Sequence, residues 1–168
     1  KLNIIGEESG SKISNKLVVK NICINSKMIK RNDIFFAIKG KRFDGNNFIS
    51  EAFKRKSSLA IVNKKDKKSF KSKQIEVGNT LNFLTKCSSI FRENINTKII
   101  AITGSCGKTT LKEMIGHTLK KMYRTTYSPK SFNNKYGVPL SLFNLKSNDN
   151  FGVFEVGMDK KGEINYLT

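Results

Sequence analysis

A short glycine loop between an apolar run and an amphipathic segment constrains the fold of this chain more than any other feature. The run Lys98 to Ile102 precedes the loop 103–110, Thr-Gly-Ser-Cys-Gly-Lys-Thr-Thr, and residues 111–122 follow with apolar side chains at helical spacing. Strand, loop and helix in this order form a nest of backbone N–H groups in front of a helix N-terminus, which binds anionic oxygens. The sequence therefore predicts a phosphate-binding loop in a parallel α/β sheet.

The side chains of this loop suit a bound triphosphate. Lys108 would supply a cation for the outer phosphates, and Thr109 would supply a hydroxyl that can ligate Mg²⁺. The loop is shorter than the common G-x-x-x-x-G-K-[ST] pattern, because its upstream glycine lies only three residues before the second one. The predicted nucleotide-binding set is Gly104, Ser105, Cys106, Gly107, Lys108, Thr109 and Thr110.

A carboxylate at the end of a second apolar run is the predicted partner of Thr109. Residues 151–156 form a continuous apolar run of the kind found in buried parallel strands, and Glu155 lies at its carboxyl end. Because ligands bind at the carboxyl ends of strands in open α/β sheets, Glu155 and Thr109 can share one Mg²⁺. A carboxylate that only caps a helix or forms a surface ion pair is the alternative, and spacing alone favours neither.

The sequence pattern of residues 1–95 predicts a smaller α/β domain. Short β-prone runs predict strands at 17–24, 34–38, 59–62 and 74–77. Apolar residues at helical spacing predict a helix around 48–53 and a second helix that has Thr80 as its N-cap. The lysine-rich segment 63–73 is expected to be a solvated loop, with a basic binding loop as the alternative. The aromatic side chains expected in the core are Phe35, Phe36, Phe43, Phe48 and Phe53.

A polar break at 94–97 separates this domain from a second one, at residues 96–168. Its predicted order is strand, phosphate loop, helix, a helical segment at 137–145 and the strand that ends near Glu155. A further helix is expected after Gly162. Because so few strands make a poor sheet, we expect this domain to be incomplete at its C-terminus.

Composition helps to decide between classes of partner. The formal net charge of +19 fits a phosphate-rich partner such as nucleic acid or an anionic membrane. Only five of the 32 basic residues are arginines, whereas base recognition and phosphate clamping favour the arginine fork. We therefore expect a compositional bias and no specific nucleic-acid surface, and we keep a basic nucleic-acid-binding module as the alternative.

The cysteines and the apolar runs bear on the compartment. Cys23, Cys87 and Cys106 show no C-x-x-C spacing, so we expect neither a disulfide framework nor a zinc site. No apolar run approaches the roughly 18 residues that span a bilayer. We expect a reduced, cytoplasmic protein without membrane insertion, a monomer, in which Cys106 of the nest has the most reactive thiol.

Four segments, in chain order, resemble the Mur ligase family. They are 34–40, Ile-Phe-Phe-Ala-Ile-Lys-Gly, with Phe43-Asp44-Gly45; the phosphate loop with Lys112-Glu113-Met114; Phe132-Asn133-Asn134 with Gly137-Val138-Pro139-Leu140; and 154–158, Phe-Glu-Val-Gly-Met, with Gly162-Glu163-Ile164. The resemblance runs from about Asn21 to the last residue. It implies a domain that binds the UDP end of a precursor, followed by a P-loop ATPase domain.

The resemblance implies an ATP-dependent amide ligase that works through an acyl phosphate. The Lys-Glu-Met and Gly-Glu-Ile segments resemble the members that add D-alanyl-D-alanine to UDP-N-acetylmuramoyl-tripeptide in peptidoglycan precursor synthesis. A sister ligase that adds the third peptide residue is one alternative, and a paralogue that binds the precursor without ligating it is another. We expect these 168 residues not to turn over by themselves.

The resemblance also implies roles for single residues. Lys108 would be catalytic at the outer phosphates of ATP, and Thr109 and Glu155 would hold Mg²⁺. Substrate contacts are implied at Ser26, Lys27, Lys39, Gly40, Asp44, Gly45 and Asn134. The chain departs from the family's Asp-Ser-Arg at Asn25 and Lys27, and this loses the planar fork of an arginine. Ser131 stands where the family usually has Asn.

Overall fold

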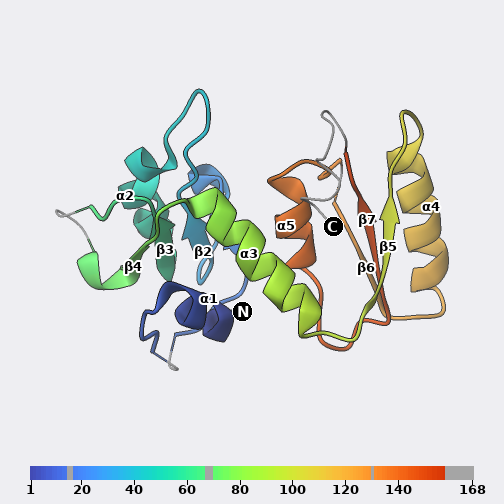
Figure 1. Ribbon diagram of the computed structural model, residues 1–168, viewed down its shortest axis with the longest axis horizontal. Coiled ribbons are helices and arrows are strands. Elements are labelled where there is room, and N and C mark those ends of the chain that lie inside the picture. The colour runs from blue at the N-terminus through green and yellow to red at the C-terminus, as the bar shows by residue number, and fades with distance from the viewer. Residues whose placement is uncertain (15–16, 67–69, 130, 158–168) are drawn as a thin grey trace. The chain divides into compact units, whose positions relative to one another are not determined.

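The computed structural model describes residues 1–14, 17–66, 70–129 and 131–157 (Figure 1). They belong to two units, residues 1–87 and 88–168, which are described separately below. Helix α3 (Thr80–Glu93) contributes its first part to one unit and its last part to the other. The boundary between residues 95 and 96 stays a prediction. The helix predicted after Gly162 lies outside the described residues.

The first unit contains a four-stranded parallel sheet. Its order follows the chain: β1 (Ile22–Cys23), β2 (Ile34–Phe36), β3 (Leu59–Val62) and β4 (Gln74–Glu76). The predicted α/β class with parallel strands is confirmed, although β1 is much shorter than the run 17–24. Helix α2 (Ile49–Lys54) lies between β2 and β3 in the chain and supplies the crossover that parallel strands require.

Both faces of this sheet are buried, and strand alternation decides which side chain faces which helix. Phe35 and Ala60 pack in one cluster with Ala52 of α2. Phe36 points to the other face, where its ring centroid lies 6.3 Å from that of Phe83 in α3. A sheet covered on both sides needs apolar residues at successive positions, which explains the continuous apolar runs of β2 and β3.

Local structure corrects two expectations in this unit and adds one helix. Phe43 is 72% exposed and not part of the core. The N-cap of α3 is Asn79, because its Oδ1 atom accepts hydrogen bonds from the N–H groups of Leu81 (3.0 Å) and Asn82 (2.9 Å). Thr80 is the first helical residue, and its buried hydroxyl donates to the carbonyl of Ala37 (3.1 Å). Helix α1 (Leu2–Ser9) was not predicted.

The described residues of the first unit also form three short 3₁₀ turns. They are η1 (Ser26–Met28), η2 (Gly45–Phe48) and η3 (Lys71–Lys73). The first follows β1, the second precedes α2, and the third lies in the predicted lysine-rich loop. In the described part of the chain, no helix has the length and apolar character needed to cross a bilayer.

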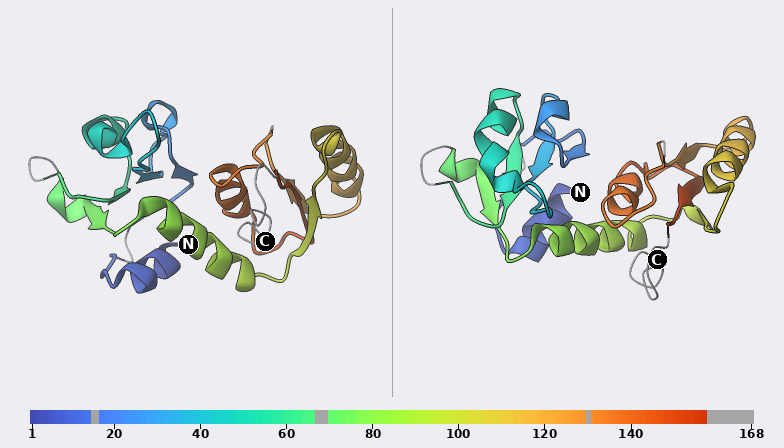
Figure 2. Two further views of the ribbon diagram at one scale, coloured as in Figure 1. Left: turned by 45° about the horizontal axis from the view of Figure 1, so that its top comes forward. Right: turned by 90° about the horizontal axis from the view of Figure 1, so that it is seen from above.

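The second unit contains a three-stranded parallel sheet with the order β5 (Lys98–Ile102), β7 (Phe151–Glu155), β6 (Thr125–Tyr127). Helix α4 (Lys108–Lys120) lies on one face, and α5 (Gly137–Leu142) lies on the other (Figures 1 and 2). Strand β6 was missed, because Thr-Thr-Tyr is too short to show an alternating pattern. Its pairing with β7 is the contact that makes it a strand.

We predict that the Asn79 cap of α3 contributes measurably to the free energy of unfolding. Replacing Asn79 with Ala removes the acceptor for two helix N–H groups and should lower the free energy of unfolding by about 1 kcal/mol. Urea denaturation of the intact protein measures this. Asn82→Ala is the matched control at an exposed position inside the same helix, and it should change stability by less than about 0.5 kcal/mol. Equal effects of the two substitutions would contradict Asn79 as the cap.

Candidate functional site

The glycine loop joins the end of β5 to the start of α4. Gly107 is the N-cap of α4 in a left-handed conformation (φ 74°), and Gly104 has φ 145°, so both positions favour glycine. The first N–H groups of α4 have no partner within the helix and point toward the loop. Residues 103–107 are exposed, and the Lys108 ammonium lies back on the loop, 2.6 Å from the carbonyl of Gly104. The nest predicted from the sequence is therefore open to a ligand from solvent.

The register of the sheet brings Thr109 and Glu155 together. Strands β5 and β7 run parallel with Ile102 opposite Glu155, so the carboxyl ends of both strands lie level. The Thr109 hydroxyl donates to Glu155 Oε2 at 2.7 Å, and Glu155 is 2% exposed. The structure thus places the two predicted metal ligands in direct contact beside the phosphate loop.

A third residue completes this contact. The side-chain amide of Asn133 donates to Glu155 Oε1 at 2.7 Å, so each oxygen of the carboxylate accepts one hydrogen bond. The backbone N–H of Gly157 returns to the carbonyl of Asn133 at 2.6 Å. Sequence reasoning pointed to the neighbouring Asn134 instead. That side chain accepts from the N–H groups of Tyr136 and Gly137 at the start of α5, and its contact to substrate stays a prediction.

These groups fit a magnesium ion. Mg²⁺ binds oxygen ligands at about 2.1 Å, so neighbouring ligands of an octahedral ion lie about 3 Å apart. Thr109 and Glu155 already present two oxygens at 2.7 Å from each other. One or two protein oxygens together with phosphate oxygens are the usual protein environment of this ion. Asn133 would orient the carboxylate as an outer partner of the metal.

The implied substrate residues of the first unit lie after β1 and after β2, at one edge of the parallel sheet. Ser26 is buried, and its hydroxyl donates to Glu51 Oε2 at 2.7 Å, a contact that sequence reasoning missed. Lys27 is exposed, and its backbone N–H donates to the Asn25 side chain at 3.0 Å. Asn25 thus acts as a local cap of η1.

The other implied residues form a tight loop after β2. Lys39 and Asp44 form an antiparallel bridge, and the N–H of Gly40 donates to the carbonyl of Phe43 at 2.8 Å. Hydrogen bonds from the backbone and the side chain of Asn46 lower the pKa of Asp44. A side chain at Gly45 would lie 2.6 Å from backbone atoms of residue 37, so glycine is required there by packing alone.

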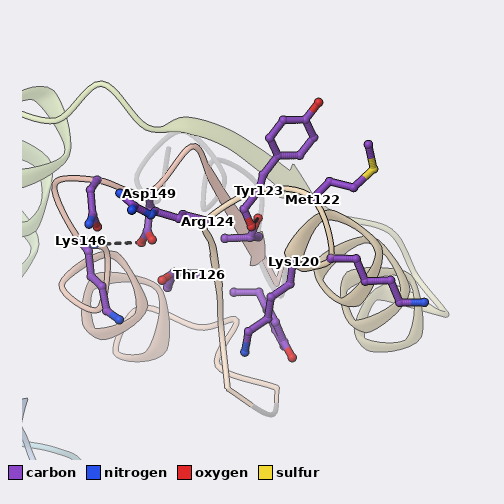
Figure 3. A pocket seen from close by; sticks show the side chains of 11 residues that line it. Lys120, Met122, Tyr123, Arg124, Thr126, Lys146 and Asp149 are labelled. Atoms are coloured by element: carbon purple, nitrogen blue, oxygen red, sulfur yellow. Dashed lines mark hydrogen bonds between the residues drawn. The ribbon is translucent and has the colours of Figure 1, made fainter.

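A hollow of about 730 Å³ lies along β6 and beside the residues that precede β7 (Figure 3). Four cationic residues line it: Lys120, Lys121, Arg124 and Lys146. Asp149 is the carboxylate among its lining residues; it is buried and accepts from the N–H of Lys146 at 2.9 Å. None of the predicted site residues lines this hollow.

The three cysteines differ in environment. Cys106 in the loop is exposed, whereas Cys87 is buried. Burial raises the pKa of Cys87 to about 12 and also raises the pKa of Cys23 above its ordinary value. Because the thiolate is the nucleophile, both shifts slow alkylation at pH 8.

We predict that iodoacetamide modifies Cys106 first. Mass spectrometry of the intact protein at pH 8 should show Cys106 alkylated before Cys23 and Cys87, because Cys106 is exposed, whereas Cys23 is partly buried and Cys87 is buried. Mg-ATP should slow this reaction, because the phosphates would cover the loop. Cys23 supplies the internal reference, as nucleotide should leave its rate unchanged. Equal Cys106 rates with and without nucleotide would contradict a nucleotide at the loop.

Comparison with known proteins finds one family over most of the chain. Residues 18–96 match the model described as Mur ligase family, catalytic domain, and residues 102–168 match the model described as Mur ligase middle domain. The second match contains the phosphate loop, Asn133 and Glu155.

Several curated relatives carry the name UDP-N-acetylmuramoyl-tripeptide–D-alanyl-D-alanine ligase. The protein of Rickettsia prowazekii is 36% identical over 158 residues, which are 94% of this chain and 35% of the relative. That of Buchnera aphidicola subsp. Acyrthosiphon pisum is 38% identical over 152 residues, which are 90% of this chain and 33% of the relative. The chain therefore spans about a third of the length of these relatives.

Solved structures of MurF proteins are similar to this chain over most of its length. MurF from Acinetobacter baumannii superposes with a TM-score of 0.86 at 31% identity, over 98% of this chain and 37% of that one. MurF of Thermotoga maritima, in complex with ADP, gives a TM-score of 0.77 at 32% identity, over 92% of this chain and 36% of that one.

Proposed function

Because the chain belongs to the Mur ligase family, we propose that the intact protein is an ATP-dependent amide ligase that joins D-alanyl-D-alanine to UDP-N-acetylmuramoyl-tripeptide. The product would serve peptidoglycan synthesis. The contact of Thr109 with the buried Glu155, beside an open phosphate loop, is the observation that carries this proposal. The names of the relatives at 36–38% identity and the ADP held by one solved relative support it.

The reaction needs two displacements. A carboxylate oxygen of the tripeptide attacks the γ-phosphorus of ATP, the bond to ADP breaks, and an acyl phosphate forms. The amine of D-alanyl-D-alanine then attacks the acyl carbon, loses a proton and expels inorganic phosphate. Both steps depend mainly on positioning and on neutralising phosphate charge.

The residues of this chain have defined tasks in the first displacement. The N–H groups of 104–110 would hold the β- and γ-phosphates, and Lys108 would leave the carbonyl of Gly104 to reach them. Thr109 and Glu155 would hold Mg²⁺, which when bound neutralises charge on the phosphate oxygens. Asn133 would keep the carboxylate in the orientation that the metal needs.

Substrate identity separates this proposal from its nearest alternatives. A sister ligase would release phosphate from ATP with a single amino acid and a shorter precursor, and a non-ligating paralogue would bind the precursor without any release. Phosphate release by the intact protein, measured with UDP-tripeptide and D-alanyl-D-alanine and then with each replaced, distinguishes the three.

We predict that Lys108→Ala abolishes ligation and spares precursor binding. Loss of a cation that neutralises transferred phosphate should reduce phosphate release at least about 100-fold. Binding of UDP-N-acetylmuramoyl-tripeptide, measured by calorimetry, should stay within a factor of about 2, because the implied precursor contacts lie mainly in the first unit. Lys120→Ala, an exposed lysine of the same helix, is the control and should retain full activity. Loss of both functions in Lys108→Ala would contradict the division of tasks.

A second candidate function, nucleic-acid binding, is favoured by the four cations around the hollow of Figure 3 and by the charge of +19. Our proposal predicts Mg-ATP binding and only non-specific oligonucleotide affinity, about 10⁻⁴ to 10⁻⁶ M at physiological salt. Fluorescence anisotropy across a salt titration measures this. Tight oligonucleotide binding with a steep loss in salt, and no ATP binding, would favour the nucleic-acid module.

A further inference from the structure

A lysine buried under the phosphate loop has no task in the steps above. Lys112 lies in the second turn of α4 and is 0% exposed. Its Nζ donates to the carbonyl of Ser128 at 2.8 Å and lies 2.9 Å from Glu113 Oε1. The side chain of Glu113 is 38% exposed, so the carboxylate reaches solvent while the ammonium does not.

Stability alone gives no reason for a cation at this position. Moving an ammonium out of water costs solvation free energy that polar contacts in the interior recover only in part. A methionine of similar length would fill the same space without this cost. A directional N–H···O bond differs from an apolar contact in that it fixes where the helix lies along its neighbours.

The contacts of one face of α4 show how the position of this helix is fixed against β6 and β7. Thr109, Lys112 and Gly116 follow one another at a spacing of three and four residues, which places them on one face of α4. Thr109 contacts Glu155 at the end of β7, and Lys112 contacts Ser128 directly after β6. At Gly116 the helix approaches β6 so closely that a Cβ would lie 2.8 Å from the Tyr127 ring.

Ser128 connects the lysine to the carboxylate. Its backbone N–H donates to the carbonyl of Val153 in β7 at 3.0 Å, and its hydroxyl oxygen lies 3.5 Å from the backbone N of Glu155. A bond from Lys112 to Ser128 therefore ties α4 to the segment that lies beside Glu155. One face of α4 thus places Thr109 against the Glu155 carboxylate and Lys112 against Ser128.

We propose that Lys112 is a positioning residue that sets the placement of Thr109 against Glu155 by anchoring α4 to Ser128. The inference rests on the proposed function, since it concerns the same magnesium site. Lys112 touches neither nucleotide nor metal in this scheme. Its loss should appear first in the magnesium dependence of nucleotide binding, before any effect on the precursor.

The test uses ADP as the probe and the intact protein. Calorimetry at a series of Mg²⁺ concentrations gives the concentration for half-maximal ADP binding. For Lys112→Met we expect this concentration to rise about 10-fold, the lower end of the effect of losing a direct hydrogen-bond partner of a metal ligand, because Lys112 acts on the ligands only through the placement of α4. Lys112→Arg keeps the cation and should restore part of the loss. Lys120→Met makes the same substitution at an exposed position of α4 and should change nothing.

The outcomes separate the two ideas. Wild-type protein that binds no ADP at any Mg²⁺ concentration would overturn the proposed function. Wild-type binding with an unchanged magnesium dependence in Lys112→Met would overturn the positioning role alone. A loss of ADP affinity by the same factor with Mg²⁺ and with EDTA would also overturn it, because general loosening of the fold acts in that way. Should Lys112→Met fail to fold, Gly116→Ala shifts α4 with the cation in place and must raise the required Mg²⁺ concentration.

Discussion

The register between β5 and β7 is the constraint on which the rest of the second unit depends. Ile102 lies opposite Glu155, and this pairing brings a hydroxyl and a carboxylate 46 residues apart in the chain to a hydrogen bond of 2.7 Å. A slip by one residue would turn Glu155 to the other face of the sheet, because side chains alternate along a strand. The phosphate loop would then keep its backbone shape and lose its metal ligand. The loop is formed by residues that are contiguous in the sequence, but the contact between Thr109 and Glu155 depends on the pairing of β5 with β7.

Each unit presents polar residues at one edge of a parallel sheet, and we propose a different ligand for each edge. Loops that follow the strands gather polar residues at one edge, while helices cover the faces and leave the strands apolar. In the first unit this edge carries Ser26 and the Asp44 loop, whose hydrogen bonds are largely internal. In the second it carries the nest and Glu155. The proposed division of tasks assigns the precursor to the first edge and ATP to the second.

Much of this organisation could be predicted from sequence, and the features missed in the second unit depend on contacts between distant segments of the chain. The apolar runs and the glycine loop indicated six of the seven described strands, helix α4 and the pairing of Thr109 with Glu155. Strand β6 could not be found, since three residues become a strand only beside β7. Asn133 and Asn134 cannot be told apart locally, because the difference lies in which one reaches Glu155. A buried Lys112 contradicts the usual exposure of lysine, and no neighbour in the sequence signals it.

The strand order of the second sheet also limits when its strands can pair during synthesis. Strand β7 lies between β5 and β6, yet it is the last of the three to be synthesised. The two outer strands do not pair with each other, so neither gains a sheet partner until residues 151–155 have left the ribosome. At about 5–20 residues per second, the glycine loop waits on the order of 2 to 10 s for Glu155. The sheet that brings the loop against Glu155 can therefore form only after this central strand has been synthesised.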